Sequence, residues 1–415
     1  MPSTDTVPVP VPQRPDRAAA QAAVGGLALQ ALLDAQGALL GWMVRLQDGS
    51  IGEPLMAAAQ AVHDATGAAS LVWVAASLDA LMDDRLDQFD PRRTVLQFEF
   101  PAERDPDTLA QCASVLAACR RLGFRVALAQ EALPVLVEPA LRGQIDLQVL
   151  HLPHASVAGA AGVDPALRPG LPLLVTGIDT EVQRALAQRV GALWFCGGWY
   201  TRPPVPPRAT MRPCHAVLLE LVALVRREAE LAEIEAVLRR DPLLSLRFLR
   251  LINHCGNGLQ TEVTSFGHAV MLLGLRKLLR WCCLLIATDA GEVAPAVGTT
   301  AVLRGRVMEL LAEDLLGPQH CDSAFIAGMF SLLDVMTGLP IARALGDLPL
   351  PQDVLDVLRA GRGPLQPLLS LAISCERDEP EGFARACEAL ALSAAQVSAV
   401  HLRALAWTEE LLERR

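Results

Sequence analysis

The chain has 415 residues, a formal net charge of −10 at pH 7 and a pI near 5.4. Hydrophobic residues make up 52% and charged residues 20%, which is typical of a folded chain rather than a disordered one. This length allows two domains, each with its own core. The acidic balance argues against a protein that binds nucleic acid by bulk electrostatics, because such proteins usually carry a basic domain or face.

The ten cysteines include no C-x-x-C pair, which favours reduced, buried thiols in a cytoplasmic protein. Residues 1–26 are rich in proline near their start and show no export signal, so we expect a flexible tail. No apolar stretch is long and uncharged enough for a membrane span of about 20 residues. We therefore expect a cytoplasmic protein with no membrane segment.

From 27 to 204, short strand-like runs alternate with helical stretches such as 107–122 and 179–190. Alternation of this kind predicts parallel strands joined by crossover helices. The span falls short of the roughly 250 residues of a full (β/α)8 barrel, so we expect a trimmed barrel. The strand-like runs are LLGWMVRL, SLVWVAAS, TVLQFEF, FRVALA, IDLQVLHL, LPLLVTG and ALWFCGG.

The order of these runs resembles the EAL domain, a TIM-like barrel that hydrolyses cyclic di-GMP with divalent metal ions. ALLGWMVRL resembles the strand with the Glu-Ala-Leu signature, and VLQFEF resembles the strand with E-x-T-E. RLGFRVALAQ, DLQVLH and LLVTGIDTEVQ follow in the family's order, and FCGGWYTRPP resembles its closing stretch. The resemblance implies where metal ligands would lie.

Most of those implied positions carry other residue types here. Glu99 matches the first glutamate of E-x-T-E, and Asp179 is a conservative replacement. Because metal-assisted hydrolysis needs several carboxylates, we predict a degenerate domain that is not an enzyme and has no metal or other cofactor. We also predict weak binding of cyclic di-GMP, since the replaced positions lack cations and hydrogen-bonding groups. The replaced positions are Met43, Ala75, Ala129, Gln130, Val149, His151 and Thr176.

A proline-rich segment divides the chain. TRPPVPPRATMRP contains five prolines, and we place a semi-rigid linker at 205–213. The predicted organisation is therefore a barrel at 27–204, the linker, and a helical domain at 214–415 with a C-terminal extension.

The stretch 241–289 predicts two strongly apolar helices around a polar, glycine-containing turn. Asp241 is a good N-cap residue, and Pro242 suits the first helical position. DPLLSLRFLRLIN and SFGHAVMLLGLRKLLRW resemble the HDOD domain, an all-helical module that is related to the HD phosphohydrolases and is found in bacterial signalling proteins. Ser331 and Leu332 occupy the positions of the catalytic His-Asp pair, so the resemblance implies a catalytically silent domain. With an EAL-like part before it, the chain resembles the YuxH-type EAL-HDOD subgroup.

The central helices carry a basic edge that is open to two interpretations. The arginine stems could lie along the core with their heads paired to carboxylates of the same domain. They could instead form a groove for an acidic partner helix or a phosphate-bearing ligand. The candidate edge comprises Arg247, Arg250, Asn253, Arg276, Lys277 and Arg280.

The last helix is expected to open with Ser393 and Gln396, which have the spacing of a capping box. Its apolar stripe has the width of one packing seam, which favours docking on its own domain and leaves a homodimer as the alternative. The stripe comprises Val397, Val400, Ala404, Trp407 and Leu411.

These expectations together describe a non-catalytic signalling or scaffold protein that acts through contacts with unidentified protein partners. One alternative is a cyclic di-GMP phosphodiesterase with residual activity. The other is a receptor that binds cyclic di-GMP or another nucleotide without catalysis.

Overall fold

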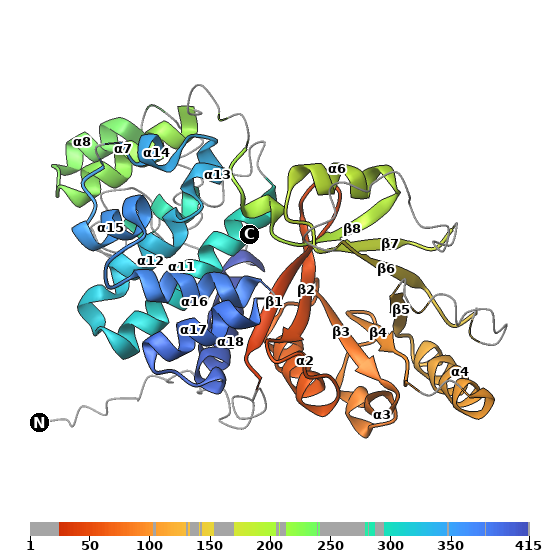
Figure 1. Ribbon diagram of the computed structural model, residues 1–415. Coiled ribbons are helices and arrows are strands. Elements are labelled where there is room, and N and C mark those ends of the chain that lie inside the picture. The colour runs from red at the N-terminus through yellow and green to blue at the C-terminus, as the bar shows by residue number, and fades with distance from the viewer. Residues whose placement is uncertain are drawn as a thin grey trace, which may run out of the picture.

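The structure is a computed structural model that describes residues 25–413, apart from gaps within that range. The gaps are 103–104, 130–131, 133–140, 142, 153–169, 205–206, 208–212, 239, 241–278, 281, 287–293, 347 and 378. Two parts are evident, a β-barrel and an assembly of helices (Figure 1). This confirms the predicted fold class, an EAL-like barrel followed by an all-helical domain.

Eight strands form a closed barrel in chain order. The first strand is antiparallel to both of its neighbours, and the remaining pairs are parallel. Seven strands coincide with the runs predicted from the sequence; the first was not predicted. The strands are β1 (Leu27–Leu33), β2 (Leu39–Leu46), β3 (Leu71–Ser77), β4 (Thr94–Glu99), β5 (Arg125–Ala129), β6 (Leu147–His151), β7 (Leu173–Thr176) and β8 (Ala192–Cys196).

The barrel interior is filled by side chains, as in other eight-stranded barrels. Alternate strand positions point inward, because successive side chains of a strand face opposite sides of the sheet. The largest of the inward side chains is Trp73, whose ring meets that of Trp194 edge-on with 5.9 Å between ring centroids. The buried interior cluster comprises Leu32, Met43, Trp73, Val95, Ala127, Leu147, Val149, Leu174 and Cys196.

Helices cover the outside of the barrel after several strands, at α2 (Glu53–Ala65), α3 (Leu78–Leu81), α4 (Pro106–Arg121) and α6 (Glu181–Arg189). Their starts follow local sequence, since Asp105 caps α4 and Thr180 forms a capping box with Gln183 at α6. Only a short turn joins β1 to β2, so no helix of the barrel itself covers β1. Its outer face packs instead against α16 (Gln366–Glu376) and α18 (Ala394–Glu413) of the helical part.

The helical part is built around the long, buried helix α11 (Pro295–Leu315), which packs against α12, α16 and α18. Gly305 of α11 and Gly328 of α12 let these two helices approach closely, because a Cβ on Gly328 would lie 2.6 Å from the Cα of Gly305. The other helices are α7 (Pro213–Arg226), α8 (Leu231–Leu238), α12 (Cys321–Phe330), α13 (Leu333–Thr337), α14 (Ile341–Leu345), α15 (Gln352–Ala360) and α17 (Pro380–Leu390). The 3-10 turns are η1 (Asp84–Gln88), η3 (Trp199–Thr201) and η4 (Pro318–His320).

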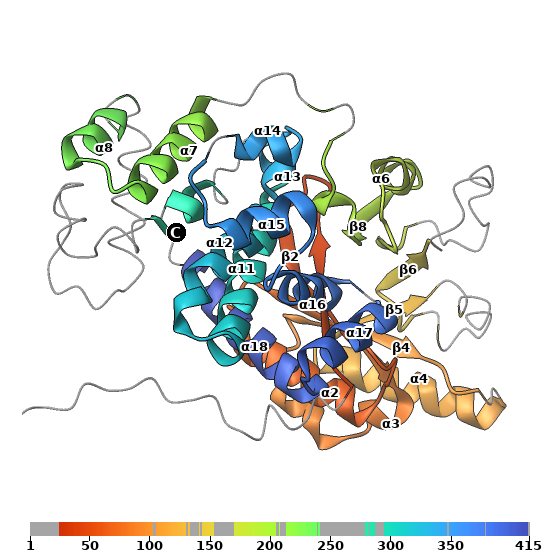
Figure 2. The ribbon, with the colours of Figure 1, turned by 60° about the vertical axis from the view of Figure 1, so that its left-hand side comes forward.

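The last helix docks within the chain. Ser393 and Gln396 make the expected reciprocal hydrogen bonds at its start. Val397, Ala404 and Leu411 are at most 7% exposed, because α18 lies against α11 on one side and against β1 and α2 on the other. Figure 2 shows α18 beside α2. The apolar stripe is therefore covered by two parts of the same chain, one of which is the barrel.

Two further observations concern the predicted segments. Most of the central stretch 241–289 lies outside the described residues, as does most of the linker at 205–213, and the domain boundaries stay predictions. Among the described helices, none is by itself long and apolar enough to cross a membrane.

Candidate functional site

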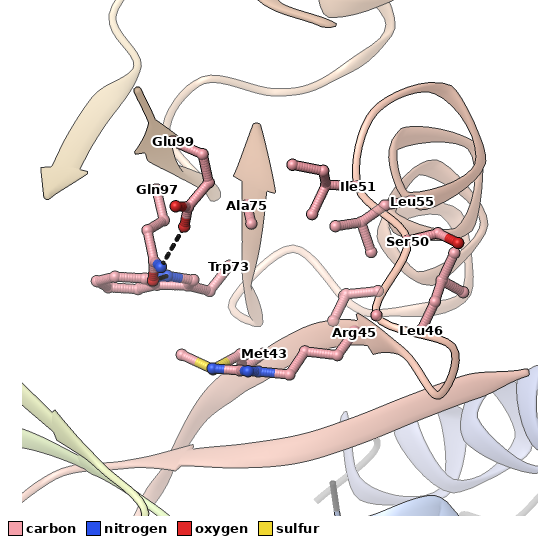
Figure 3. A pocket seen from close by; sticks show the side chains of 12 residues that line it. Met43, Arg45, Leu46, Ser50, Ile51, Leu55, Trp73, Ala75, Gln97 and Glu99 are labelled. Carbon is pink, nitrogen blue, oxygen red and sulfur yellow. Dashed lines mark hydrogen bonds between the residues drawn. The ribbon is translucent and has the colours of Figure 1, made fainter. Parts of the chain in front are cut away.

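A pocket of about 160 Å³ lies where β2, β3 and β4 end (Figure 3). The carboxyl ends of barrel strands are the usual place for a site in this architecture, because the loops that follow the strands meet there. Polar and apolar side chains share its wall. The lining residues are Met43, Val44, Arg45, Leu46, Gly49, Ser50, Ile51, Leu55, Trp73, Ala75, Gln97 and Glu99.

The strand register explains how three of these side chains come together. Ala75 of β3 is the backbone partner of Gln97 in β4, and Ser77 is the partner of Glu99. Gln97 and Glu99 are two residues apart and therefore lie on the same side of β4. Figure 3 shows both next to Trp73, with Ala75 leaving room between them and the loop that carries Ile51.

A chain of hydrogen bonds fixes the polar wall of the pocket. The indole N–H of Trp73 donates to Oε1 of Gln97 at 3.1 Å, and Nε2 of Gln97 donates to Oε1 of Glu99 at 2.9 Å. Because Trp73 is only 1% exposed, its indole holds the amide of Gln97 in one orientation. That orientation turns the amide donor toward the Glu99 carboxylate.

Arg45 was not predicted from the sequence, because the EAL resemblance implies no functional role at its position. It follows Met43 by two residues on β2, so both side chains lie on the same side of the strand and line the pocket. Trp73 and Gln97 were missed for the same reason. The period of two in LLGWMVRL could have identified Arg45. Its presence removes the argument that the barrel mouth lacks cationic and hydrogen-bonding groups.

The other positions implied by the EAL resemblance are spread around the barrel. Met43 and Val149 belong to the buried interior, and Ala129 ends β5. On the side opposite β3, Nδ1 of His151 lies 3.0 Å from Oγ1 of Thr176. Asp179, after β7, donates a hydrogen bond from its backbone N–H to Oε1 of Gln183 at 2.8 Å. Gln130 lies outside the described residues.

The EAL resemblance implies divalent metal ions at this end of the barrel. Among the described residues, no three His, Cys, Asp or Glu side chains lie close enough together to hold an ion. Among the described residues that line the pocket, Glu99 is the only carboxylate. The described part of the mouth therefore does not fit a metal centre, because hard divalent cations require several oxygen ligands.

In the helical part, the two positions that correspond to the catalytic His-Asp pair of HD phosphohydrolases carry residues that make structural contacts. Ser331, at the position expected for the catalytic His, accepts a hydrogen bond from Nη1 of Arg304 at 2.6 Å and donates to the carbonyl of Gly328. Leu332, at the position expected for the Asp, is 2% exposed.

Of the candidate interaction edge, only Arg280 lies within the described residues. Its guanidinium donates to both oxygens of Glu309 at 2.6 and 2.8 Å and lies over the rings of Phe325 and Trp407, at 4.2 and 4.9 Å from their centroids. These contacts join α11, α12 and α18. Arg247, Arg250, Asn253, Arg276 and Lys277 lie outside the described residues, so the proposed groove stays a prediction.

Comparison with known proteins agrees with this architecture. Residues 211–337 match the HDOD domain. The chain is 26% identical over 240 residues to the cyclic di-GMP phosphodiesterase CdgJ of Vibrio cholerae, covering 57% of this chain and 56% of CdgJ. It is 24% identical over 253 residues to the uncharacterised protein YuxH of Bacillus subtilis, covering 59% and 61%. The chain thus spans little more than half the length of these curated relatives.

Among solved structures, an EAL domain protein of Listeria monocytogenes is 14% identical, with a TM-score of 0.33, covering 45% of this chain and 90% of that one. The chain contains an HDOD domain and has the EAL-HDOD architecture, a closed EAL-like barrel followed by helices. This confirms the resemblance found in the sequence. The chain is similar to CdgJ and YuxH.

One prediction has to be corrected. The carboxylate pattern of the sequence predicted that the chain is not an enzyme, whereas the relative CdgJ is named a cyclic di-GMP phosphodiesterase. That prediction rested on the number of carboxylates at positions that were each inferred from a short motif. Such a count is a weak basis for excluding activity, because it covers single positions only, and residues 133–140 and 153–169, which follow β5 and β6 in the chain, are not among those described.

Proposed function

We propose that this chain is a cyclic di-GMP signalling protein in which the barrel mouth binds an anionic ligand and the helical part acts on protein partners. The proposal rests above all on the position of Arg45 in the pocket, beside polar groups that are already held in place. An arginine can bind a phosphate through two parallel N–H groups, which suits a dinucleotide with two phosphodiesters. The name of CdgJ supports the choice of cyclic di-GMP as the ligand to test.

Protein contacts are proposed as the output because the chain joins two parts through an extensive internal interface. Tyr200 of the barrel side shares a hydrogen bond with Thr300 of α11 at 3.0 Å, and both residues are buried. A change at the barrel mouth therefore has a packed route to the helices. A cytoplasmic location, a homodimer and the identity of the partner stay predictions.

The test is calorimetry of the full chain with cyclic di-GMP, with and without magnesium. We expect binding to the unaltered chain and about tenfold weaker binding by Arg45→Gln, since a charge-assisted contact to phosphate is lost. Arg121→Gln is the matched control, because Arg121 ends α4 and is exposed away from the pocket. Absence of binding, or equal affinity in both variants, would reject the pocket as the ligand site.

Hydrolysis of cyclic di-GMP is the second candidate function, favoured by the name of CdgJ. Water would open one phosphodiester and give the linear dinucleotide, which chromatography separates from the cyclic form. Glu99→Gln tests whether the barrel mouth takes part, because it removes the carboxylate of the pocket and keeps its size. Turnover that survives unchanged in this variant would assign the reaction to residues other than Glu99.

A further inference from the structure

Strand β2 connects the pocket to the helical part, because its two faces have different neighbours. Met43 and Arg45 line the pocket on one face. Trp42, on the opposite face, is 2% exposed and belongs to the core that the barrel shares with the helices. A shift of β2 would therefore move the wall of the pocket and the contact with the helical part together.

Glu409, close to the end of α18, holds this strand. Its Oε1 accepts a hydrogen bond from the indole N–H of Trp42 at 3.2 Å. Its Oε2 accepts from the hydroxyl of Ser70 at 2.9 Å and from the backbone N–H of Gly67 at 3.4 Å. Glu409 is only 8% exposed, so the carboxylate depends on these three donors to offset the cost of leaving water.

The hairpin formed by β1 and β2 makes further hydrogen bonds to the helical part. Gln47, directly after β2, donates to the carbonyl oxygens of Ser374 at 2.8 Å and Arg377 at 3.3 Å. The backbone N–H of Leu27, at the start of β1, donates to Oγ of Ser398 in α18 at 2.9 Å. Figure 1 shows the helical part against β1 and β2, with β5 and β6 on the far side of the barrel.

We propose that Glu409 is a positioning residue for the barrel-mouth pocket. Through Glu409, α18 docks on Trp42 and thereby fixes β2. The docking of α18 and the arrangement of Met43 and Arg45 in the pocket therefore depend on each other. The β1–β2 hairpin with α18 is the element with two states, docked and released. Thermodynamic linkage makes the dependence reciprocal, so a ligand that prefers the ordered pocket also favours docking. The ligand's role rests on the proposed function, whereas the mechanical link does not.

Hydrogen exchange of the full chain, read by mass spectrometry without ligand, tests the link from the helix to the pocket. In Glu409→Ala we expect about tenfold faster exchange in β2, because three hydrogen bonds to a buried carboxylate are lost, and unchanged exchange in β5 and β6. Trp42→Phe removes a single donor and leaves a smaller aromatic ring in its place. This variant should show the same pattern of exchange, faster in β2 and unchanged in β5 and β6, with a smaller increase. It replaces Glu409→Ala as the test if that variant is too unstable to measure.

A pair of cavity variants tests the reverse direction. Met43→Ala and Leu174→Ala each remove a buried side chain from the same interior cluster, but Leu174 is in β7, away from α18. We expect faster exchange in α18 for Met43→Ala, by about tenfold, and no change there for Leu174→Ala. An unchanged α18 in the first variant, or equal acceleration in both, would overturn the link.

Calorimetry separates this inference from the proposed function. If cyclic di-GMP does not bind but the exchange patterns appear as expected, the link stands and the assignment of the ligand fails. If cyclic di-GMP binds with equal affinity to Glu409→Ala and to the unaltered chain, the ligand assignment stands and the positioning role of Glu409 fails.

Discussion

Arg304 and Glu376 form a bidentate ion pair that is almost completely buried. Nε and Nη2 of Arg304, in α11, donate to the two carboxylate oxygens of Glu376, at the end of α16, at 2.8 and 2.6 Å. The side chains are 4% and 11% exposed. Burial works against the charge of Arg304, but the carboxylate of Glu376 outweighs it and raises the pKa of the guanidinium. The pair lies next to Tyr200 and Ser331, where the barrel meets the helices.

We predict that removing one partner of this pair costs far more than removing both. Glu376→Gln should lower the free energy of unfolding by roughly 3 kcal/mol, because a buried guanidinium is left without its counter-charge. The double variant Arg304→Met, Glu376→Leu should lose less than either single variant, since no buried charge remains. Urea unfolding of Glu376→Gln, of the single variants Arg304→Met and Glu376→Leu and of the double variant measures this, and additive losses of the last two single variants in the double variant would contradict it.

His401 predicts a dependence of stability on pH. It is 1% exposed in α18, and its Nδ1 has no hydrogen-bond partner among the described residues. Burial lowers the pKa of this imidazole to about 4, against an ordinary value of 6.5. Below pH 6.5 the unfolded chain takes up a proton that the folded chain does not, so this contribution to stability is complete above pH 6.5 and is lost as the pH falls toward 4.

The size of this effect can be measured with one variant. Between pH 7 and pH 5 the free energy of unfolding should fall by about 2 kcal/mol on account of this group, given about 1.4 kcal/mol for each unit of pKa difference. His401→Leu removes the titration and should show a correspondingly smaller fall, whatever its stability at pH 7. Equal pH dependence in the two proteins would mean that His401 is not the group responsible.

The sequence predicted β2 to β8 because a strand inside a covered barrel is buried on both faces and appears as an apolar run. It did not predict β1, because LALQALL is rich in good helix formers. All of β1 pairs with β2, and Leu32 and Leu33 also pair with Cys196 and Phe195 of β8, which closes the barrel. This pairing between strands overrides the local helix propensity of the segment.

The candidate site, like the strands of the barrel, could be predicted from the sequence only in part. Glu99 follows from a motif, and Arg45 could have been found from strand periodicity once Met43 was placed inside the barrel. The contact between Trp42 and Glu409 could not, because the two residues are 367 positions apart and nothing in either segment marks the other. That α18 docks partly on the barrel is likewise a property of the folded chain.

We predict that the indole N–H of Trp73 stabilises the polar wall of the pocket. Trp73→Phe would leave Oε1 of Gln97 without this donor, and the Gln97 amide would no longer be held toward Glu99. The loss should be about 3 kcal/mol, from the missing hydrogen bond and from the smaller ring. Thermal unfolding of Trp73→Phe and of Trp73→Phe with Gln97→Leu measures it, and the second change should restore part of the stability because no partly buried side-chain carbonyl is left unpaired.

The crossing of α11 and α12 gives the last prediction. A Cβ on Gly328 would meet the Cα and N of Gly305 at 2.6 and 2.8 Å, which are backbone atoms of a buried helix that cannot move aside without separating the two helices. Gly328→Ala should therefore destabilise the chain by about 3 kcal/mol, near the upper end for overpacked cores, although alanine is the better helix former. Gly143→Ala is the control, because none of the described residues outside its immediate chain neighbours lies within 4 Å of a Cβ at that position. It should be neutral or slightly stabilising. Thermal unfolding of the two variants compares them directly, and a neutral Gly328→Ala would mean that α11 and α12 are not in the close contact described.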